Sequence, residues 1–136
     1  MAKVLVDVIY INSDENLSIG LDRNDLYRLF SNLISNSIKY THVGEVIVVV
    51  RFDKVASLAE VQISDTGIGI PYEDQENIFE TRFRSSNAIN NNIEGTGIGL
   101  SIVKRIVTKV GGTIHINSQL NRGTTFTVQL PCFQSE

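Results

Sequence analysis

The order in which apolar patterns change along the chain constrains the fold more than any other feature. Short β-rich segments surround two longer stretches of helical spacing, without a strict strand–helix–strand repeat. The β-rich segments cover 3–10, 17–21, 45–52, 58–64, 113–117 and 125–130, and the helical stretches cover 23–40 and 100–110, with a short helical piece near 73–79. This order predicts an α+β two-layer sandwich, with helices on one face of a largely antiparallel sheet.

Short turns separate the β-rich segments into three pairs, and each pair is expected to form a β-hairpin. The turns are 12–16, 53–57 and a turn that contains Gly123. Pro131 is expected to close the domain. For the first helix, Asp22 is the expected N-cap, and the glycine pair after Val110 is expected to stop the second helix.

Composition excludes several function classes. The 136 residues suit one domain over 1–136, and a net charge of −3 without a dense basic cluster argues against nucleic-acid binding. No apolar run approaches the roughly 20 residues of a membrane span. The single Cys132 cannot form an internal disulfide, no spacing resembles a zinc site, and no secretory signal is evident. We therefore expect a cytoplasmic domain that does not contact the membrane.

Two glycine-containing segments are candidates for ligand binding. Residues 95–99 (GTGIG) open directly into the second helix, where backbone amides and the helix dipole favour a phosphate. The segment matches neither a dinucleotide fingerprint nor a Walker loop, and helix capping with close packing is the alternative. In 65–71 (DTGIGIP), Asp65 could accept the amine of adenine while glycine backbone lets a flat ring approach. A simple Asx-type turn is the alternative there.

The first helix has two different faces. One face is apolar and the other is polar, and a solvated surface is the alternative to a binding role for the polar side. The apolar face carries Leu26, Phe30, Leu33 and Ile34, and the polar face carries Asn32, Asn36, Lys39 and Tyr40. Residues 81–96 have no periodicity, which predicts a mobile flap or, alternatively, an inert surface insertion.

Five segments in a fixed order carry a resemblance to a known family. They are 32–41 (NLISNSIKYT), 65–71 (DTGIGIP), 78–80 (IFE), 95–102 (GTGIGLSI) and 123–131 (GTTFTVQLP). In this order they resemble the N box, first glycine box, F box, second glycine box and closing strand of the ATP-binding catalytic domain of bacterial sensor histidine kinases. That domain belongs to a superfamily with gyrase, the Hsp90 chaperones and MutL, and the resemblance implies a mixed sheet backed by three helices.

The resemblance implies ATP and Mg²⁺ as ligands and assigns roles to single residues. Asn36 would ligate Mg²⁺ and Asn32 would support the triphosphate, while Lys39 would meet a phosphate. Tyr40 would pack near the adenine, whose amine Asp65 would accept. Gly67 and Gly69 would shape the wall beside the adenine, and Ile70 and Thr125 are also assigned to nucleotide binding. The residues that would wrap the triphosphate are Gly95, Thr96, Gly97, Gly99 and Leu100.

The F box departs from the family pattern, which has an aromatic pair followed by arginine after Phe-Glu. Here the residues after Glu80 are Thr-Arg-Phe-Arg. Arg84 matches without a gap and is the preferred contact for the γ-phosphate, with Arg82 as the other candidate. Together with Asn32 and Lys39, Arg84 completes the expected catalytic set.

Asn32 also bears on the reaction. ATP-hydrolysing members of the superfamily carry a glutamate at this position, and an amide cannot act as a general base. We therefore expect a kinase domain that presents the γ-phosphoryl group to a histidine on a separate dimerisation domain, with a response regulator acting downstream. His42 and His115 are not in a segment of that kind. A monomer is expected, and the alternatives are a nucleotide-binding regulatory module and an ATP-hydrolysing clamp.

Overall fold

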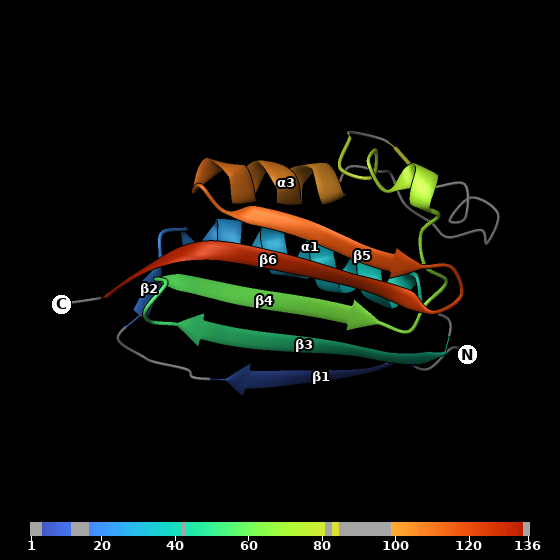
Figure 1. Cartoon of the computed structure of the whole chain (residues 1–136), viewed down its shortest axis with the longest axis horizontal. Coiled ribbons are helices and arrows are strands. Elements are labelled where there is room, and N and C mark those ends of the chain that lie inside the picture. Colours follow the sequence, from blue (N-terminus) through green and yellow to red (C-terminus); the bar gives the residue numbers. More distant parts are fainter. Residues whose placement is uncertain (1–3, 12–16, 42, 81–82, 85–98, 135–136) are drawn as a thin grey trace.

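The computed structural model describes residues 4–11, 17–41, 43–80, 83–84 and 99–134. Within these ranges, two α-helices and one 3₁₀ helix lie on a six-stranded mixed sheet (Figure 1). The elements are β1 (Val4–Ile11), β2 (Leu17–Ile19), α1 (Arg23–Lys39), β3 (Gly44–Asp53), β4 (Leu58–Asp65), η1 (Tyr72–Asp74), α3 (Gly99–Lys109), β5 (Thr113–Gln119) and β6 (Gly123–Gln134). The predicted α+β class is confirmed. The expected helical piece near 73–79 is one 3₁₀ turn, shorter than predicted.

The strands follow the order β1-β3-β4-β6-β2, and β5 also pairs with β6. The two hairpins predicted in the second and third pairs are confirmed, because β3 pairs with β4 and β5 pairs with β6, both antiparallel. In each case a short turn returns the chain directly to the neighbouring strand, which is the connection that antiparallel pairing favours.

The first predicted hairpin is wrong. β1 runs parallel to β3, with Val4 opposite Gly44, and β2 pairs antiparallel with β6, with Ile19 opposite Cys132. Parallel strands need a crossover connection, usually a helix, and α1 supplies it between β1 and β3. The turn-forming residues between β1 and β2 therefore separate two strands that lie in different parts of the sheet.

Pro131 does not close the domain, because β6 continues through it to Gln134. The pairing of β6 with β4 ends at Pro131, opposite Leu58, and its pairing with β2 begins at Cys132. The Cys132 amide donates to the carbonyl of Ser57 at 2.9 Å. Proline has no N–H to donate to a ladder, and here it lies where the strand changes partner.

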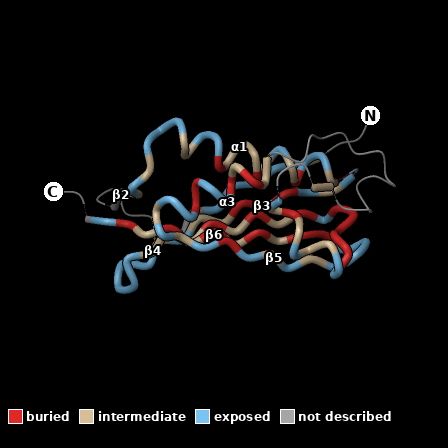
Figure 2. Tube along the Cα trace, turned by 90° about the horizontal axis from the view of Figure 1, so that it is seen from above, coloured by how far each residue is buried: buried red, intermediate tan, exposed pale blue. Residues whose placement is uncertain are grey.

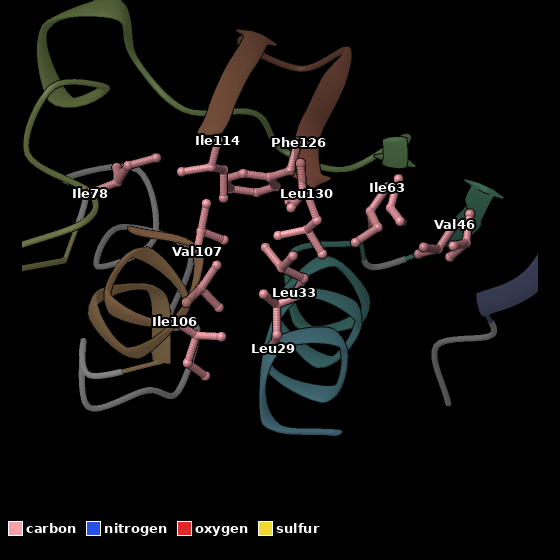
Figure 3. Packing of buried hydrophobic residues seen from close by; sticks show 14 of the residues in the cluster. Leu29, Leu33, Val46, Ile63, Ile78, Ile106, Val107, Ile114, Phe126 and Leu130 are labelled. Carbon is pink, nitrogen blue, oxygen red and sulfur yellow. The ribbon is translucent and has the colours of Figure 1, made fainter. Parts of the chain in front are cut away.

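The core lies between one face of the sheet and the two helices (Figures 2 and 3). Successive side chains of a strand point to opposite faces, and β4 buries every second side chain against the helices. The largest fully buried side chains are Phe126, Leu29, Leu33, Ile63, Leu130, Val46, Val103, Val107 and Val128. None of the described helices is long and apolar enough for a membrane span.

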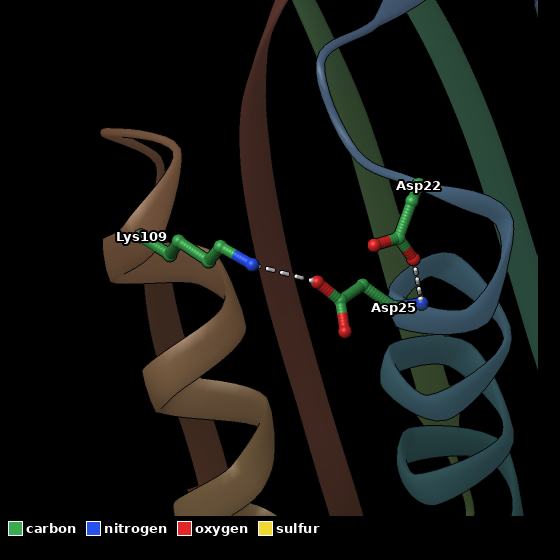
Figure 4. A network of polar contacts seen from close by, with 3 residues as sticks. All are labelled: Asp22, Asp25 and Lys109. Atoms are coloured by element: carbon green, nitrogen blue, oxygen red, sulfur yellow. Dashed lines mark hydrogen bonds and ion pairs between the residues drawn. The ribbon is translucent and has the colours of Figure 1, made fainter.

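The ends of the helices follow the predicted signals. The Asp22 carboxylate accepts a hydrogen bond from the Asp25 amide at 2.8 Å and caps α1. Gly111, which follows the end of α3, has φ +74°, a conformation that glycine adopts without strain. Lys109 at the end of α3 reaches Asp25 at the start of α1, with 3.2 Å between Nζ and Oδ2 (Figure 4). The two helices are thus tied at this end as well as through the core.

Candidate nucleotide-binding site

Asp65 is the buried last residue of β4. Its Oδ1 accepts hydrogen bonds from the amides of Gly67 at 2.9 Å and Thr124 at 3.2 Å. The first bond makes an Asx-type turn, as the alternative interpretation expected. Both bonds go to Oδ1, so Oδ2 keeps its capacity to accept from another donor. The turn and a ligand-binding role are therefore compatible.

Burial raises the pKa of Asp65 above its ordinary value of 3.8. Hydrogen bonds from the backbone of Gly67 and Thr124, and then the side chain of Ser37, oppose that effect. A carboxyl group in such a place loses its own hydration, which makes an amine donor from a ligand a favourable partner for the charged form.

Three glycines let the backbone close around this carboxyl group. A Cβ on Gly67 would lie 2.2 Å from the carbonyl oxygen of Tyr40, and one on Gly123 would lie 1.9 Å from that of Asp65. Gly69 has φ +75°, and a Cβ there would lie 2.2 Å from the carbonyl oxygen of Gln119. These glycines permit the close contacts between backbone segments beside Asp65, where a Cβ would not fit.

The first glycine box is joined to the end of α1. The carbonyl of Tyr40, the C-cap of α1, accepts a hydrogen bond from the Ile68 amide at 3.0 Å. The side chain of Tyr40 also packs against buried Ile68. This contact places the C-terminal end of α1, where the N-box segment ends, directly beside the first glycine-box segment.

Two polar side chains that were not identified from the sequence support this loop. The Ser118 hydroxyl accepts from the Ile70 amide at 2.8 Å and lies 2.8 Å from the Thr124 hydroxyl. Gln75 donates to the carbonyl of Ile70 at 3.0 Å and to that of Ser118 at 3.2 Å. Isolated polar residues in a strand and a turn carry no sequence signal for such a role. Ile70 itself is buried in the main core.

Thr125 does not face Asp65. Its hydroxyl lies 2.9 Å from that of Ser64, which is its partner across β4 and β6. Successive side chains of a strand point to opposite faces, and the preceding residue, buried Thr124, is the one whose amide contacts Asp65. We therefore replace Thr125 by Thr124 as the candidate from the closing strand.

The predicted phosphate end lies between α1 and the beginning of α3. Asn32 and Asn36 are half-buried on α1, and Lys39 is exposed in its last turn. A Cβ on Gly99, the first residue of α3, would lie 3.8 Å from Cγ of Asn32. The asparagine face of α1 is therefore next to the positive end of the α3 dipole. Half-buried Leu100 packs against the core.

Several predicted residues can be placed only in part. Arg84 is half-buried after Phe83, whose side chain packs against the core. Arg82, Gly95, Thr96 and Gly97 lie outside the described residues, as does the predicted flap over 81–96 except for 83–84. His42 is also outside them. His115 is exposed on β5, opposite Thr127, and does not face Asp65.

The buried face of α1 is centred on other residues than the sequence predicted. Leu29, Leu33 and Ser37 are buried, whereas Leu26, Phe30 and Ile34 are half-buried. The half-buried residues line an apolar groove together with Ile19, Arg23, Tyr27, Ser31, Ser35 and Ile38. Because α3 packs beside α1, the buried stripe turns toward α3 and the sheet, which helical periodicity alone does not reveal.

The donor set suits magnesium better than a metal held by protein alone. Among the described residues, no group of three or more His, Cys, Asp or Glu side chains is placed to hold an ion. Mg²⁺ is commonly held by one or two protein oxygens together with phosphates and waters. The half-buried side chain of Asn36 offers one amide oxygen of this kind.

Comparison with known proteins gives the same family. Residues 21–134 match the family described as histidine kinase-, DNA gyrase B- and HSP90-like ATPases. Drug sensory protein A of Synechocystis is 42% identical over 132 residues, covering 90% of this chain and 20% of that protein. The sensor-like histidine kinase SenX3 of Mycobacterium bovis is 38% identical over 120 residues, covering 88% of this chain and 29% of that protein. The chain thus spans less than a third of the length of these relatives.

Solved structures share the fold. The mycobacterial sensor histidine kinase MprB superposes with a TM-score of 0.82 at 29% identity, covering 96% of this chain and 85% of that chain. The catalytic domain of histidine kinase ThkA gives 0.75 at 25% identity, with coverages of 94% and 80%. The chain therefore belongs to the family of histidine kinase-, DNA gyrase B- and HSP90-like ATPases, as a catalytic ATP-binding domain of the sensor histidine kinase type.

Proposed function

We propose that this domain holds Mg-ATP and positions its γ-phosphoryl group for transfer to a histidine on a separate dimerisation domain, in two-component signalling. The observation that carries the proposal is the buried Asp65, which lies beside the C-terminal end of α1 and accepts its two backbone hydrogen bonds at Oδ1 alone, while Asn32 of the same helix lies beside the beginning of α3. A carboxylate for the base and a helix N-terminus for the phosphates suit the two ends of a nucleotide.

Each residue of the candidate site is assigned a separate role in nucleotide binding. The Asp65 carboxylate would accept the amine of adenine, and Tyr40 with Ile68 would cover the ring. Asn36 would hold Mg²⁺, which neutralises phosphate charge when bound. Lys39 and Arg84 would supply positive charge to the phosphates, with Arg82 as the other candidate for the γ-phosphate. Asn32 would orient the triphosphate.

The absence of a carboxylate at position 32 favours phosphoryl transfer over hydrolysis. The amide of Asn32 cannot take a proton from water, so the domain orients the phosphate for an outside nucleophile. In the transfer, the bond between the γ-phosphorus and the leaving oxygen of ADP breaks. A bond from that phosphorus to an imidazole nitrogen forms, and the imidazole releases its N–H proton to solvent. Positioning and charge neutralisation are what such a reaction needs from protein.

The test mixes this chain, γ-labelled ATP, Mg²⁺ and the histidine-bearing dimerisation domain of its parent protein. The expected product is acid-labile label on the dimerisation domain, lost when its acceptor histidine is replaced by glutamine. Asn36→Ala should reduce labelling about tenfold or more and weaken ATP binding only when Mg²⁺ is present. Tight ATP binding without transfer to the acceptor would contradict the kinase function and favour a regulatory nucleotide-binding module.

A further inference from the structure

The segment that follows the first glycine box leads directly to Arg84, the preferred candidate for the γ-phosphate. Its backbone forms four successive single turns. In these turns the amides donate to carbonyls three residues earlier, at distances from 2.9 to 3.2 Å, and the donors are Asp74, Asn77, Glu80 and Phe83. Bonds between residues three apart have poorer geometry than those of an α-helix, so a run of single turns is not stiff by itself. The position of Arg84 therefore depends on what anchors these turns to the rest of the fold.

Apolar side chains hold this segment against the core. Ile78 is buried and points toward the other core side chains (Figure 3). Phe79 and Phe83 are half-buried and pack against the same core. The hydrophobic effect is non-directional, so these contacts fix how deep the segment lies better than they fix its orientation.

Gln75 supplies a directional anchor for the same segment. Its side-chain NH₂ group donates to the carbonyl of Ile70 at 3.0 Å and to that of Ser118 at 3.2 Å. An amide NH₂ group has two N–H bonds, and both acceptors are backbone carbonyls, so one orientation of the amide satisfies both. This half-buried side chain thus joins the glycine-box loop, the turns before Arg84 and the end of β5.

The same contacts continue to the carboxyl group of Asp65. The Ser118 hydroxyl lies 2.8 Å from the hydroxyl of Thr124, its partner across β5 and β6. The Thr124 amide in turn donates to Oδ1 of Asp65 at 3.2 Å. The base end of the candidate site is therefore linked to Gln75 by a continuous series of hydrogen-bonded residues.

We propose that Gln75 is a positioning residue for phosphoryl transfer, which fixes the segment that carries Arg84 relative to the base end of the site. The inference rests on the proposed function and deepens it, because it names the group that sets where Arg84 meets the γ-phosphate. The base end itself is held by the close backbone contacts at Gly67 and Gly69. Loss of the Gln75 amide should therefore affect a triphosphate much more than a diphosphate.

Two substitutions remove the donors of Gln75 in different ways. Gln75→Glu keeps the length and shape but turns a charged acceptor toward two carbonyl oxygens, whereas Gln75→Met keeps the approximate length with neither charge nor donor. Calorimetry with Mg²⁺ compares ADP with AMPPNP, an ATP analogue whose bridge between the β- and γ-phosphates is not cleaved. Both variants should weaken AMPPNP binding about tenfold and ADP binding less than about twofold. Gln62→Glu, the same change on the face of β4 away from the helices, is the matched control and should change neither affinity.

A double-mutant cycle tests whether Gln75 acts through Arg84. Arg84→Ala alone should weaken AMPPNP binding relative to ADP binding about tenfold or more. If Gln75 positions Arg84, the addition of Gln75→Met to Arg84→Ala should cause no further loss, whereas independent residues give losses that multiply. The initial rate of phosphoryl transfer to the acceptor histidine, at saturating ATP, should follow the same pattern.

The outcomes separate this inference from the proposed function. Equal losses of ADP and AMPPNP affinity would assign Gln75 to the base wall, and losses that multiply with Arg84→Ala would show that it does not act through Arg84. Either result overturns the inference, as do unchanged affinities in both Gln75 variants. Thermal unfolding shows whether each variant is folded, and Gln75→Met, which introduces no charge, decides the matter if Gln75→Glu is not. If the unchanged chain binds both nucleotides but does not label the acceptor histidine, the proposed function fails, while the affinities still decide the inference.

Discussion

The two ends of the candidate site are built in different ways. At the base end, Asp65, Gly67 and Gly123 are buried, and backbone segments touch without room for a Cβ. At the phosphate end, Asn32 and Asn36 are half-buried on α1 and Lys39 is exposed, beside the start of α3. The base end is therefore fixed by the fold before any ligand arrives, whereas the phosphate end offers side chains that can adjust to phosphates and a metal ion. Changes at the base end should disturb folding and binding together unless they spare the backbone contacts.

The largest effect is expected from Gly123→Ala at the base end. Its φ is +118°, and the added Cβ would lie 1.9 Å from the Asp65 carbonyl, so β4 and β6 would have to separate. We expect about 3 kcal/mol or more of lost stability, measured by urea unfolding, together with lost ADP binding. Gly111→Ala is the control, since its φ is +74° but nothing lies within 4 Å. It should cost only about 1 kcal/mol and keep ADP binding.

Asp65→Asn should separate binding from folding at the same end. The asparagine carbonyl can still accept from Gly67 and Thr124, while its NH₂ group would face the adenine amine as a second donor. We expect a roughly 10- to 100-fold loss of ADP affinity, since a hydrogen bond to a charged group contributes about 1.5–3 kcal/mol. Calorimetry gives the affinity, and Asp53→Asn, at the exposed last residue of β3, is the control. A variant that binds ADP normally would remove Asp65 from base recognition.

The raised pKa of Asp65 predicts a pH dependence of stability. The unfolded chain loses this proton near pH 3.8, and the folded chain keeps it to a higher pH. Between the two pKa values the folded state binds more protons, so the Asp65 contribution to stability falls as pH rises through that window. The free energy of unfolding of the nucleotide-free chain, measured in urea from pH 4 to pH 7, should therefore fall more steeply with pH than that of the Asp65→Asn variant. Identical profiles for the two chains would contradict the burial effect.

The smallest effect is expected far from both ends of the site. Lys109→Ala removes the ion pair with Asp25, in which the lysine side chain is 67% exposed. Exposed pairs contribute about 0.2–1 kcal/mol. The free energy of unfolding in urea should therefore fall by less than about 1 kcal/mol, and the ADP affinity should not change. A clear loss of affinity would mean that the relative placement of α1 and α3 controls the phosphate end.

Local signals in the sequence were sufficient for the parts of the fold that depend on neighbouring residues. Asp22 and Gly111 marked helix ends correctly, and short turns identified the hairpins β3–β4 and β5–β6. The same reasoning failed for β1 and β2. Alternation of apolar and polar residues shows that a segment can be a strand, but it does not identify the strand with which that segment pairs. β1 and β2 are neighbours in the sequence, yet they pair with β3 and β6 because α1 forms a crossover between β1 and β3.

The same division holds for the candidate site. The ordered motifs predicted that Asn36 and Asp65 belong to one site and identified the family, because each motif is a short run of residues whose spacing can be compared directly. The pairing register of β6 with β4 decides which of Thr124 and Thr125 lies on the same face as Asp65. The buried Ser37 hydroxyl, which has no hydrogen-bond partner of standard geometry among the described residues, is likewise seen only in the packed structure. The sequence by itself thus determined the two α-helices, two of the three predicted hairpins and the family. Only the tertiary structure decided strand partners, side-chain faces and buried polar groups, because these depend on contacts between residues far apart in the chain.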